Sequence, residues 1–572
     1  MNRLSFLRKP RAIALLVLSS LTPVTVTAKS TAPKLVLQIT VDQLRSDMPG
    51  RLLDRMGDGG FRYLYEQGVV FADAQHAHAN TETIVGHATL ATGAHPSAHG
   101  MVGNVWFDYG LNRLVYNLED ERYPLLGEGT DVDKKTELDP TQKVAKVSGR
   151  SPANILASTF SDELALHTAG KAKIFGVSVK DRGAITMAGH AGKAFWFSKQ
   201  AGEFVTSHFY YDANPPWVFA WNAKRAIKRY AGTSWELLQD QESYLHGAED
   251  DQEWEIALPG YGRTFPHPFG KEESSIFTTL LTLSPAGDEL TLDFAKSLID
   301  HEKIGQDEVT DYLSVSFSST DYIGHFFGPS SLESEDNLLH LDRTLAALLK
   351  HVDEKVGLDR TLIVFSADHG AAEVPGYLNQ FGIEAKNVAP KTWDKGPGMT
   401  ALKKRFGIAE ELIQTYFHPY IYLNHEAIEA RELDLAEVQA AVAAELQKFP
   451  AIAMAAASSA LTQGELPDTD LTRSIAKNHN ARRSGDVYVV FQPHSLTSDL
   501  EGTMVACTHG SPWRYDTHVP VIFAGAGIKP REVFRQIHTV DVAPTLAAWL
   551  GTKQPSCTAG KILGEVVEQR KR

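Results

Sequence analysis

Five short apolar runs, each bounded by polar residues, constrain the fold more than any other feature of this sequence. They are short and rich in Val, Ile and Leu, which is typical of buried parallel strands. The runs are Leu35 to Thr40, Ile174 to Val179, Leu313 to Phe317, Leu362 to Phe365 and Val519 to Phe523. Helical patterns such as Leu290 to Ile299 and Leu338 to Val352 lie between them. The alternation predicts an α/β fold: a doubly wound, mostly parallel sheet flanked by helices.

The chain reads as one large domain with insertions. Its hydrophobic content of 43% is spread evenly, and no Pro-, Gly- or Ser-rich linker divides it. We therefore predict a single domain over residues 29–572, with cap insertions at roughly 195–285 and 380–500. In the second insertion Asp434 is expected to cap a helix that runs through Leu446, because apolar residues recur there at helical spacing.

Residues 1–28 have the pattern of a secretory signal peptide. Basic residues precede an apolar run from Ala12 to Leu21, and cleavage is expected near Ala28. The run is short, and no later stretch approaches the roughly 20 apolar residues of a membrane span. We expect a periplasmic or secreted protein without stable membrane association after cleavage.

Charge and cysteine content restrict the partners. The sequence has 56 Lys+Arg against 70 Asp+Glu, a net charge of −14, and an acidic surface of this kind argues against nucleic-acid binding. Cys507 and Cys557 are the two cysteines, and in an oxidising compartment a disulfide between them is slightly favoured over two free thiols. Metal ligation by cysteine is not expected. The oligomeric state is not readable.

Charged side chains follow four of the five expected strands. The residues are Asp42 after the first, Lys180 to Arg182 after the second, Asp321 and His325 after the third, and Asp368 and His369 after the fourth. Ligands of open α/β sheets bind beyond the carboxyl ends of the strands, so we expect these side chains to meet at one rim. Each has an ordinary alternative: Asp42 could cap a helix that begins at Gln43, and Asp321 and His325 could form a solvated i,i+4 pair. Their shared position favours a site.

Carboxylates and imidazoles without thiolates suit Zn²⁺ or Mn²⁺. These side chains exceed what one tetrahedral ion needs, and His509 in "CTHGSPW" would complete two sets of three ligands. Two ions about 4 Å apart are the usual clamp for in-line phosphoryl displacement. Other histidines are expected to pack or to form hydrogen bonds, and His87 to orient the helix that follows Thr83. The packing histidines are His76, His78, His95 and His99.

The sequence resembles the alkaline phosphatase superfamily, and within it the PafA-type, phosphate-irrepressible alkaline phosphatases. The resemblance runs from about residue 34 to 545 and is less clear around 200–280 and 380–500. It is carried by "TVDQLRSDM", "TIVGHATLATGAHPSAHGMVGN", "VSVKDRG", "SPAGDELTLDFA", "SSTDYIGHFFGP", "FSADHG" and "HGSPW".

The resemblance implies two Zn²⁺ ions and a threonine nucleophile. It assigns one zinc to Asp321, His325 and His509, and the other to Asp42, Asp368 and His369. Thr83 would be the nucleophile, with its oxygen on the second zinc. Composition alone does not choose between Thr83 and Thr81, whereas the family spacing T-x-x-G-H matches Thr83. A threonine hydroxyl needs such activation at neutral pH, because it is otherwise a poor nucleophile.

Lys180 and Arg182 alternate in a stretch that reads as extended, so they can point the same way, although a solvated basic turn fits equally well. The resemblance implies that both, together with Asn104, contact the phosphoryl oxygens. A diester carries a second organic group where these donors require an oxygen, so the trio predicts a preference for small-molecule phosphate monoesters.

The predicted function is that of an exported, zinc-dependent alkaline phosphatase acting through a phosphothreonine. The alternative is a phosphodiesterase or nucleotide pyrophosphatase of the same superfamily. A sulfatase is disfavoured because the C-x-P-x-R and S-x-P-x-R motifs are missing, and a cofactor-independent mutase because those enzymes are usually cytosolic. A non-catalytic exported metal- or phosphate-binding protein is a more distant alternative, since binding alone does not require Thr83. The natural substrate is not readable from the sequence.

Overall fold

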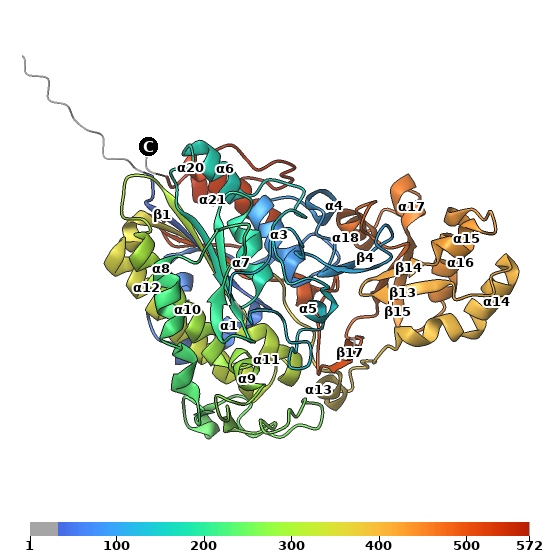
Figure 1. The fold of residues 1–572 in the computed structure, drawn as a ribbon, viewed down its shortest axis with the longest axis horizontal. Helices are drawn as coiled ribbons and strands as arrows, with labels where there is room; N and C mark the ends of the chain where they lie inside the picture. The colour runs from blue at the N-terminus through green and yellow to red at the C-terminus, as the bar shows by residue number, and fades with distance from the viewer. Residues whose placement is uncertain (1–31, 128, 501, 571–572) are drawn as a thin grey trace, which may run out of the picture. The chain divides into compact units, whose positions relative to one another are not determined.

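A nine-stranded sheet forms the centre of the computed structural model, which describes residues 32–127, 129–500 and 502–570 (Figure 1). The expected signal peptide lies outside these residues. In spatial order the strands are β20 (Arg531–Val533), β2 (Val69–Phe71), β19 (Val521–Gly525), β12 (Thr361–Ala367), β1 (Leu35–Val41), β11 (Asp311–Phe317), β6 (Ile174–Ser178), β7 (Lys193–Ser198) and β8 (Glu203–Val205).

The middle of the sheet is parallel, as the sequence predicts. β1 pairs in parallel with β11 and β12, and β6 and β7 continue the parallel order beyond β11. The expectation that Val519 to Phe523 forms a parallel strand is wrong, because β19 runs antiparallel to β12. The reason is the chain path: Gly370, just after β12, donates a backbone hydrogen bond to Asp516, so the chain enters β19 at the rim where β12 ends.

Helices cover both faces of the sheet, which confirms the doubly wound α/β prediction. On one face Leu37 and Ile39 of β1 belong to a core that includes α10 (Pro285–Glu302) and α12 (Leu332–Lys355). On the other face Val36 of β1 belongs to a second core. That core includes residues of α3 (Thr83–Thr92), α6 (Phe160–His167), α7 (Asp181–Ala188) and α20 (Val542–Leu550). The alternation of side chains along β1 therefore supplies both layers.

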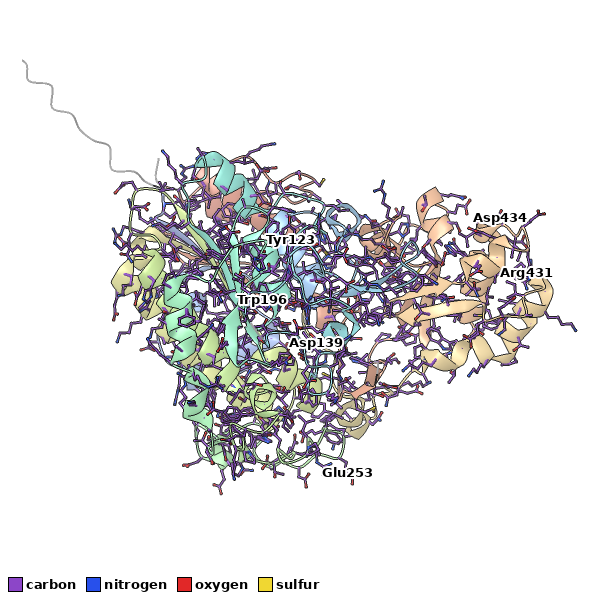
Figure 2. The ribbon with its side chains drawn as sticks, in the orientation of Figure 1. Tyr123, Asp139, Trp196, Glu253, Arg431 and Asp434 are labelled. Atoms are coloured by element: carbon purple, nitrogen blue, oxygen red, sulfur yellow. The ribbon has the colours of Figure 1, made fainter. Side chains whose placement is uncertain are left out.

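A second, antiparallel sheet of four strands lies within the predicted second insertion. Its strands, in spatial order, are β13 (Ile413–Phe417), β14 (Tyr420–Leu423), β16 (Val487–Phe491) and β15 (Ile452–Ala457). Helix α16 (Leu435–Leu446) packs on it, and the Asp434 side chain accepts a hydrogen bond from Ala436 N, as expected for its cap (Figure 2). The first predicted insertion, 195–285, begins inside the main sheet with β7 and β8. A capping role for either segment stays a prediction.

The predicted disulfide is wrong, because both cysteines are free thiols. Cys507 is fully buried beside α11 (Ser319–Phe327), where its thiol contacts the backbone oxygen of Gly324, whereas Cys557 is exposed. Two side chains in such different surroundings do not meet.

Within the described part of the chain, none of the helices has the length and apolar character needed to cross a membrane.

Candidate active site

The carboxyl ends of three neighbouring strands bring most of the predicted ligands together. Asp42 follows β1 directly, Asp368 and His369 follow β12, and Asp321 and His325 lie on α11, which follows β11. The ligands form two groups, and within each group the ligand atoms lie within 4.8 Å of one another. The groups are Asp321, His325 and His509, and Asp42, Asp368 and His369. They have the membership that the sequence predicts for two metal sites, and ion binding at either stays a prediction.

Each histidine of these groups is oriented by a backbone carbonyl. The Nδ1 atoms of His325, His369 and His509 lie 2.8–2.9 Å from the oxygens of Cys507, Gly370 and Thr81 respectively. A carbonyl only accepts, so each ring donates from Nδ1 and directs its Nε2 to a carboxylate of the same group, 3.2–3.4 Å away. Such an outer hydrogen bond is the usual partner of a metal-bound histidine. The donor set therefore fits two Zn²⁺ ions.

The group of Asp42, Asp368 and His369 is completely buried. Asp42 Oδ1 lies 3.4 Å from His369 Nε2, and Asp368 Oδ2 lies 3.1 Å from His87 Nδ1, but none of these three ligand atoms has a partner in good hydrogen-bond geometry among the described residues. Burial opposes the charge on His369, but Asp368 and Asp42 outweigh it and raise its pKa to about 9. Buried polar atoms without well-formed hydrogen bonds are costly, and a bound cation would give all three ligand atoms a direct partner.

The Lys180 ammonium lies between the two groups. Its Nζ is 2.8 Å from Asp42 Oδ2 and also contacts Asp321 Oδ2, and all three side chains are buried. Burial lowers the pKa of Lys180, but Asp321 and Asp42 outweigh it and raise that pKa above its ordinary value. Lys180 therefore stays charged at the junction of the two groups.

Gln43, which the sequence analysis does not single out, links the two groups as well. Its Nε2 donates to Asp321 Oδ1 at 2.9 Å, and its backbone N–H donates to Asp368 Oδ1 at 3.2 Å. The backbone φ of Gln43 is 66°, in the left-handed region. Its place directly after Asp42 is the only signal in the sequence, and Asp42 does not cap a helix at this point, because the first helix after it begins at Asp47.

Thr83 is the first residue of α3 and is 1% exposed. The helix packs directly on the segment after β12. The approach is so close that a Cβ atom at Gly86 would lie 1.9 Å from the backbone oxygen of Asp368. His87 Nδ1 lies 2.8 Å from the backbone oxygen of Thr83 and 3.1 Å from Asp368 Oδ2, so its ring joins the first turn of α3 to the segment after β12. The N-terminus of a helix favours negative charge, which suits an alkoxide at Thr83.

The two candidate threonines have different surroundings. The Thr81 hydroxyl donates to the Ser511 oxygen at 3.0 Å and accepts from Gly510 N at 3.2 Å, so it is used to hold the loop that carries His509. Thr83 Oγ1 instead faces Arg182, whose Nη2 lies 3.4 Å away.

Asn104 lies at the same end of α3. Its Oδ1 accepts a hydrogen bond from Ile84 N at 3.1 Å, and its backbone N–H donates to Glu82 Oε2. Burial is the main cause that raises the pKa of Glu82 to about 7. With Oδ1 engaged, the Nδ2 amide of Asn104 is the group that can donate to a ligand.

Arg182 is positioned by Asp139, a second residue that the sequence analysis does not single out. Arg182 Nη1 donates to Asp139 Oδ2 at 2.6 Å, and both side chains are buried. The expectation that Lys180 and Arg182 share an extended segment is wrong: Lys180 is the N-cap of α7 and Arg182 lies in its first turn. The sequence "DPT" marks Asp139 as the cap of helix α5 (Pro140–Val144), and nothing local indicates its contact with Arg182.

The four histidines that the sequence analysis expects to pack, His76, His78, His95 and His99, lie outside both ligand groups. His76 Nδ1 and His99 Nε2 lie 2.9 and 3.3 Å from the hydroxyls of Thr539 and Thr89. His78 is fully buried and His95 half-buried. Burial is the main cause that lowers the pKa of each of these four imidazoles.

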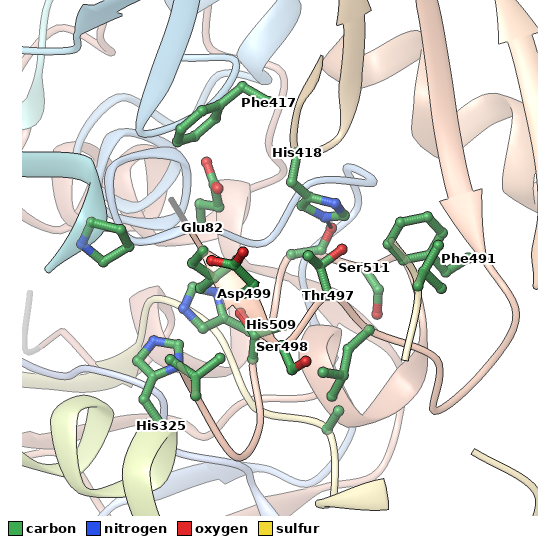
Figure 3. A pocket seen from close by; sticks show the side chains of 18 of the residues that line it. Glu82, His325, Phe417, His418, Phe491, Thr497, Ser498, Asp499, His509 and Ser511 are labelled. Atoms are coloured by element: carbon green, nitrogen blue, oxygen red, sulfur yellow. Dashed lines mark hydrogen bonds between the residues drawn. The ribbon is translucent and has the colours of Figure 1, made fainter. Parts of the chain in front are cut away.

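A cavity of about 300 Å³ opens onto this site. Arg182, Asn104 and the group of Asp321, His325 and His509 line it, and Figure 3 shows Glu82, His325 and His509 around the same space. Thr83, Lys180 and the other ligand group are buried and do not line it. The cavity therefore gives a ligand access to one side of the paired groups.

Comparison with known proteins finds a matching family, similar sequences and a similar fold. The sequence profile of the type I phosphodiesterase / nucleotide pyrophosphatase family matches residues 36–512. The chain is 34% identical to alkaline phosphatase PafA of Elizabethkingia meningoseptica, over 94% of each protein. It is 33% identical to a protein of Myroides odoratus named calcium-transporting ATPase, over 94% of this chain and 95% of that protein. A crystal structure of PafA superposes with a TM-score of 0.85 at 32% identity, covering 94% of this chain and 99% of that one.

Proposed function

The chain belongs to the type I phosphodiesterase / nucleotide pyrophosphatase family, among the PafA-type alkaline phosphatases, and on this basis we propose that it hydrolyses phosphate monoesters through a phosphothreonine at Thr83. It is a phosphoesterase by family. The monoester preference, the nucleophile, the two zinc ions and export from the cytoplasm are the parts that we propose.

The contact between Arg182 and Thr83 carries the proposal. A guanidinium 3.4 Å from the Thr83 hydroxyl can bind the unesterified oxygens of a phosphoryl group as Thr83 attacks it. The Asn104 amide lies at the same helix end, and Lys180 lies where the two ligand groups meet. Three donors for three oxygens favour a monoester, because a diester lacks one of those oxygens.

Two Zn²⁺ ions, held by the two ligand groups, would supply Lewis acidity at the attacking and leaving oxygens. The residues of the chain do the rest. Thr83 loses its hydroxyl proton to solvent, and its oxygen bonds to phosphorus as the bond to the leaving oxygen breaks. The leaving oxygen takes a proton from solvent. Water then attacks the phosphothreonine, its oxygen bonds to phosphorus as the bond to Thr83 Oγ1 breaks, the water's proton passes to Thr83 Oγ1 by way of solvent, and phosphate leaves.

The test compares kcat/KM of the zinc-loaded protein for p-nitrophenyl phosphate and a matched diester at mildly alkaline pH. Thr83→Ala should lower the monoester rate by more than about 10³-fold while the bound zinc stays unchanged, and Thr83→Ser should retain part of the activity. Mass spectrometry of acid-quenched protein should locate the phosphate on Thr83. A wild-type protein that prefers the diester supports the phosphodiesterase that the family name suggests, and full activity in Thr83→Ala excludes the nucleophile.

A further inference from the structure

The cavity at the candidate active site is larger than one phosphoryl group requires. Its volume of about 300 Å³ is at the lower end of sites for small organic ligands, which span roughly 300–1,000 Å³. The residues placed at the phosphoryl group, Arg182 and Asn104, occupy one side of it. Much of the remaining wall comes from the second sheet, from residues 495–500 and from Val505.

Those other walls are largely apolar and aromatic. Phe417 at the end of β13 and Phe491 at the end of β16 face the cavity in Figure 3, and Val388, Leu496 and Leu500 also line it. Ser495, Thr497 and Ser498 add hydroxyl groups between them. Phe417 and Phe491 are 9% and 5% exposed, so their positions are fixed by packing. Aromatic rings offer a large and rigid contact area to another ring.

Charge on the lining disfavours an anionic leaving group. Among the lining residues that the structure describes, Arg182 and Lys391 are the lysine and arginine side chains, and Arg182 is already bound to Asp139. Lys391 Nζ lies 3.5 Å from Asp499 Oδ2, and both side chains are exposed. Glu82 and Asp516 add further carboxylates. Among the described lining residues, Lys391 is therefore the one lysine or arginine away from the phosphoryl end, and it is paired with Asp499.

We propose that the second sheet, residues 495–500 and Val505 form a leaving-group subsite for an uncharged aromatic group, so that aryl phosphates are preferred over nucleotides and other esters with additional phosphates. The inference rests on the proposed function, because it assigns the leaving-group end of the same cavity.

The first experiment measures kcat/KM of Phe417→Ala and Phe417→Leu for phenyl phosphate and for methyl phosphate. The ratio of variant to wild type cancels the different reactivities of the two esters. Phe417→Ala should lower the phenyl phosphate value about ten-fold, as expected for the loss of most of one aromatic contact, and Phe417→Leu should lower it less. Methyl phosphate should change less than about two-fold, as should both esters in the exposed control Phe534→Ala. Equal losses for both esters in a folded variant overturn the subsite.

A second variant does not depend on the packing of Phe417. Asp499→Asn removes the partner of the exposed Lys391 and should raise kcat/KM for ATP by up to about five-fold, the scale of one exposed ion pair, with phenyl phosphate unchanged. No rise for ATP, or an equal rise for phenyl phosphate, contradicts the charge argument. A wild type that hydrolyses neither methyl nor phenyl phosphate defeats the proposed function. A wild type that hydrolyses both, with unchanged ratios in the variants, defeats the subsite alone.

Discussion

Arg182 Nη1 donates a hydrogen bond to Asp139 Oδ2 at 2.6 Å, although the two residues lie on different elements and 43 positions apart. The contact holds one end of the guanidinium while Nη2 faces Thr83. The oxygen-binding geometry at Thr83 therefore depends on a residue that itself does not touch the reacting atoms.

Asp139→Asn should weaken this positioning and keep the fold. Asn also caps a helix, so α5 should persist. The loss of a charged hydrogen bond is worth about 1.5–3 kcal/mol, so kcat/KM for a monoester should fall about 10- to 100-fold. The measurement is a double-mutant cycle with Arg182→Ala, in which Asp139→Asn should add little. Additive losses would mean that Asp139 acts independently of Arg182.

Gln43→Ala should weaken metal binding at the group that contains Asp321, because it removes the side-chain donor to Asp321 Oδ1, whereas the backbone N–H that donates to Asp368 is retained. The loss of an outer hydrogen bond to a ligand commonly lowers metal affinity about 10- to 100-fold. Zinc affinity measured by competition with a chelator checks this, with the exposed Gln463→Ala as the matched control. If zinc affinity is unchanged in Gln43→Ala, the Gln43 side chain does not contribute to metal binding.

Lys180 should matter more to stability in the metal-free protein than in the zinc-loaded protein. Lys180→Met leaves Asp42 and Asp321 buried without their ammonium partner. Removing one partner of a buried ion pair lowers the free energy of unfolding by about 3–5 kcal/mol. Bound zinc should offset part of this loss. Urea unfolding of wild type and variant, each with zinc and after chelation, gives the four values required. An equal loss in both states would show that the carboxylates and metal are not coupled.

Stability should fall in acid partly through His99. Burial, followed by the nearby His95, lowers the pKa of His99 to about 3 in the folded chain, and Nδ1 accepts a hydrogen bond from Met101 N. The folded pKa lies below the unfolded value of about 6.5, so on acidification the unfolded state binds the proton first.

This difference should lower the free energy of unfolding by about 1.4 kcal/mol per pH unit between roughly pH 6 and pH 4. Above about pH 6.5, the unfolded pKa, neutral His99 makes its full contribution to the free energy of unfolding. His99→Asn keeps an acceptor for Met101 and removes the titration, so its unfolding free energy should fall less steeply over the same interval. Parallel slopes for wild type and variant would exclude His99 as a contributor.

Local sequence patterns predicted several residues of the candidate site. Asp42 and Asp368 could be placed at one rim because each follows an apolar run, and strand ends in a parallel sheet share an edge. The same reasoning failed for β19, because an apolar run does not indicate whether the strand is parallel or antiparallel to its neighbour. It also failed for Lys180 and Arg182, because the start of α7 left no cap signal that separates a helix from an extended segment.

The sequence by itself determined the alternation of strands and helices and the residues that follow each strand, because side-chain periodicity acts over a few neighbouring positions. Only the tertiary structure decided that Arg182 binds Asp139, that Gln43 joins Asp321 to Asp368, and that Cys507 and Cys557 remain apart. These relations depend on how distant segments pack, and the contact energies that select them are shared among many residues.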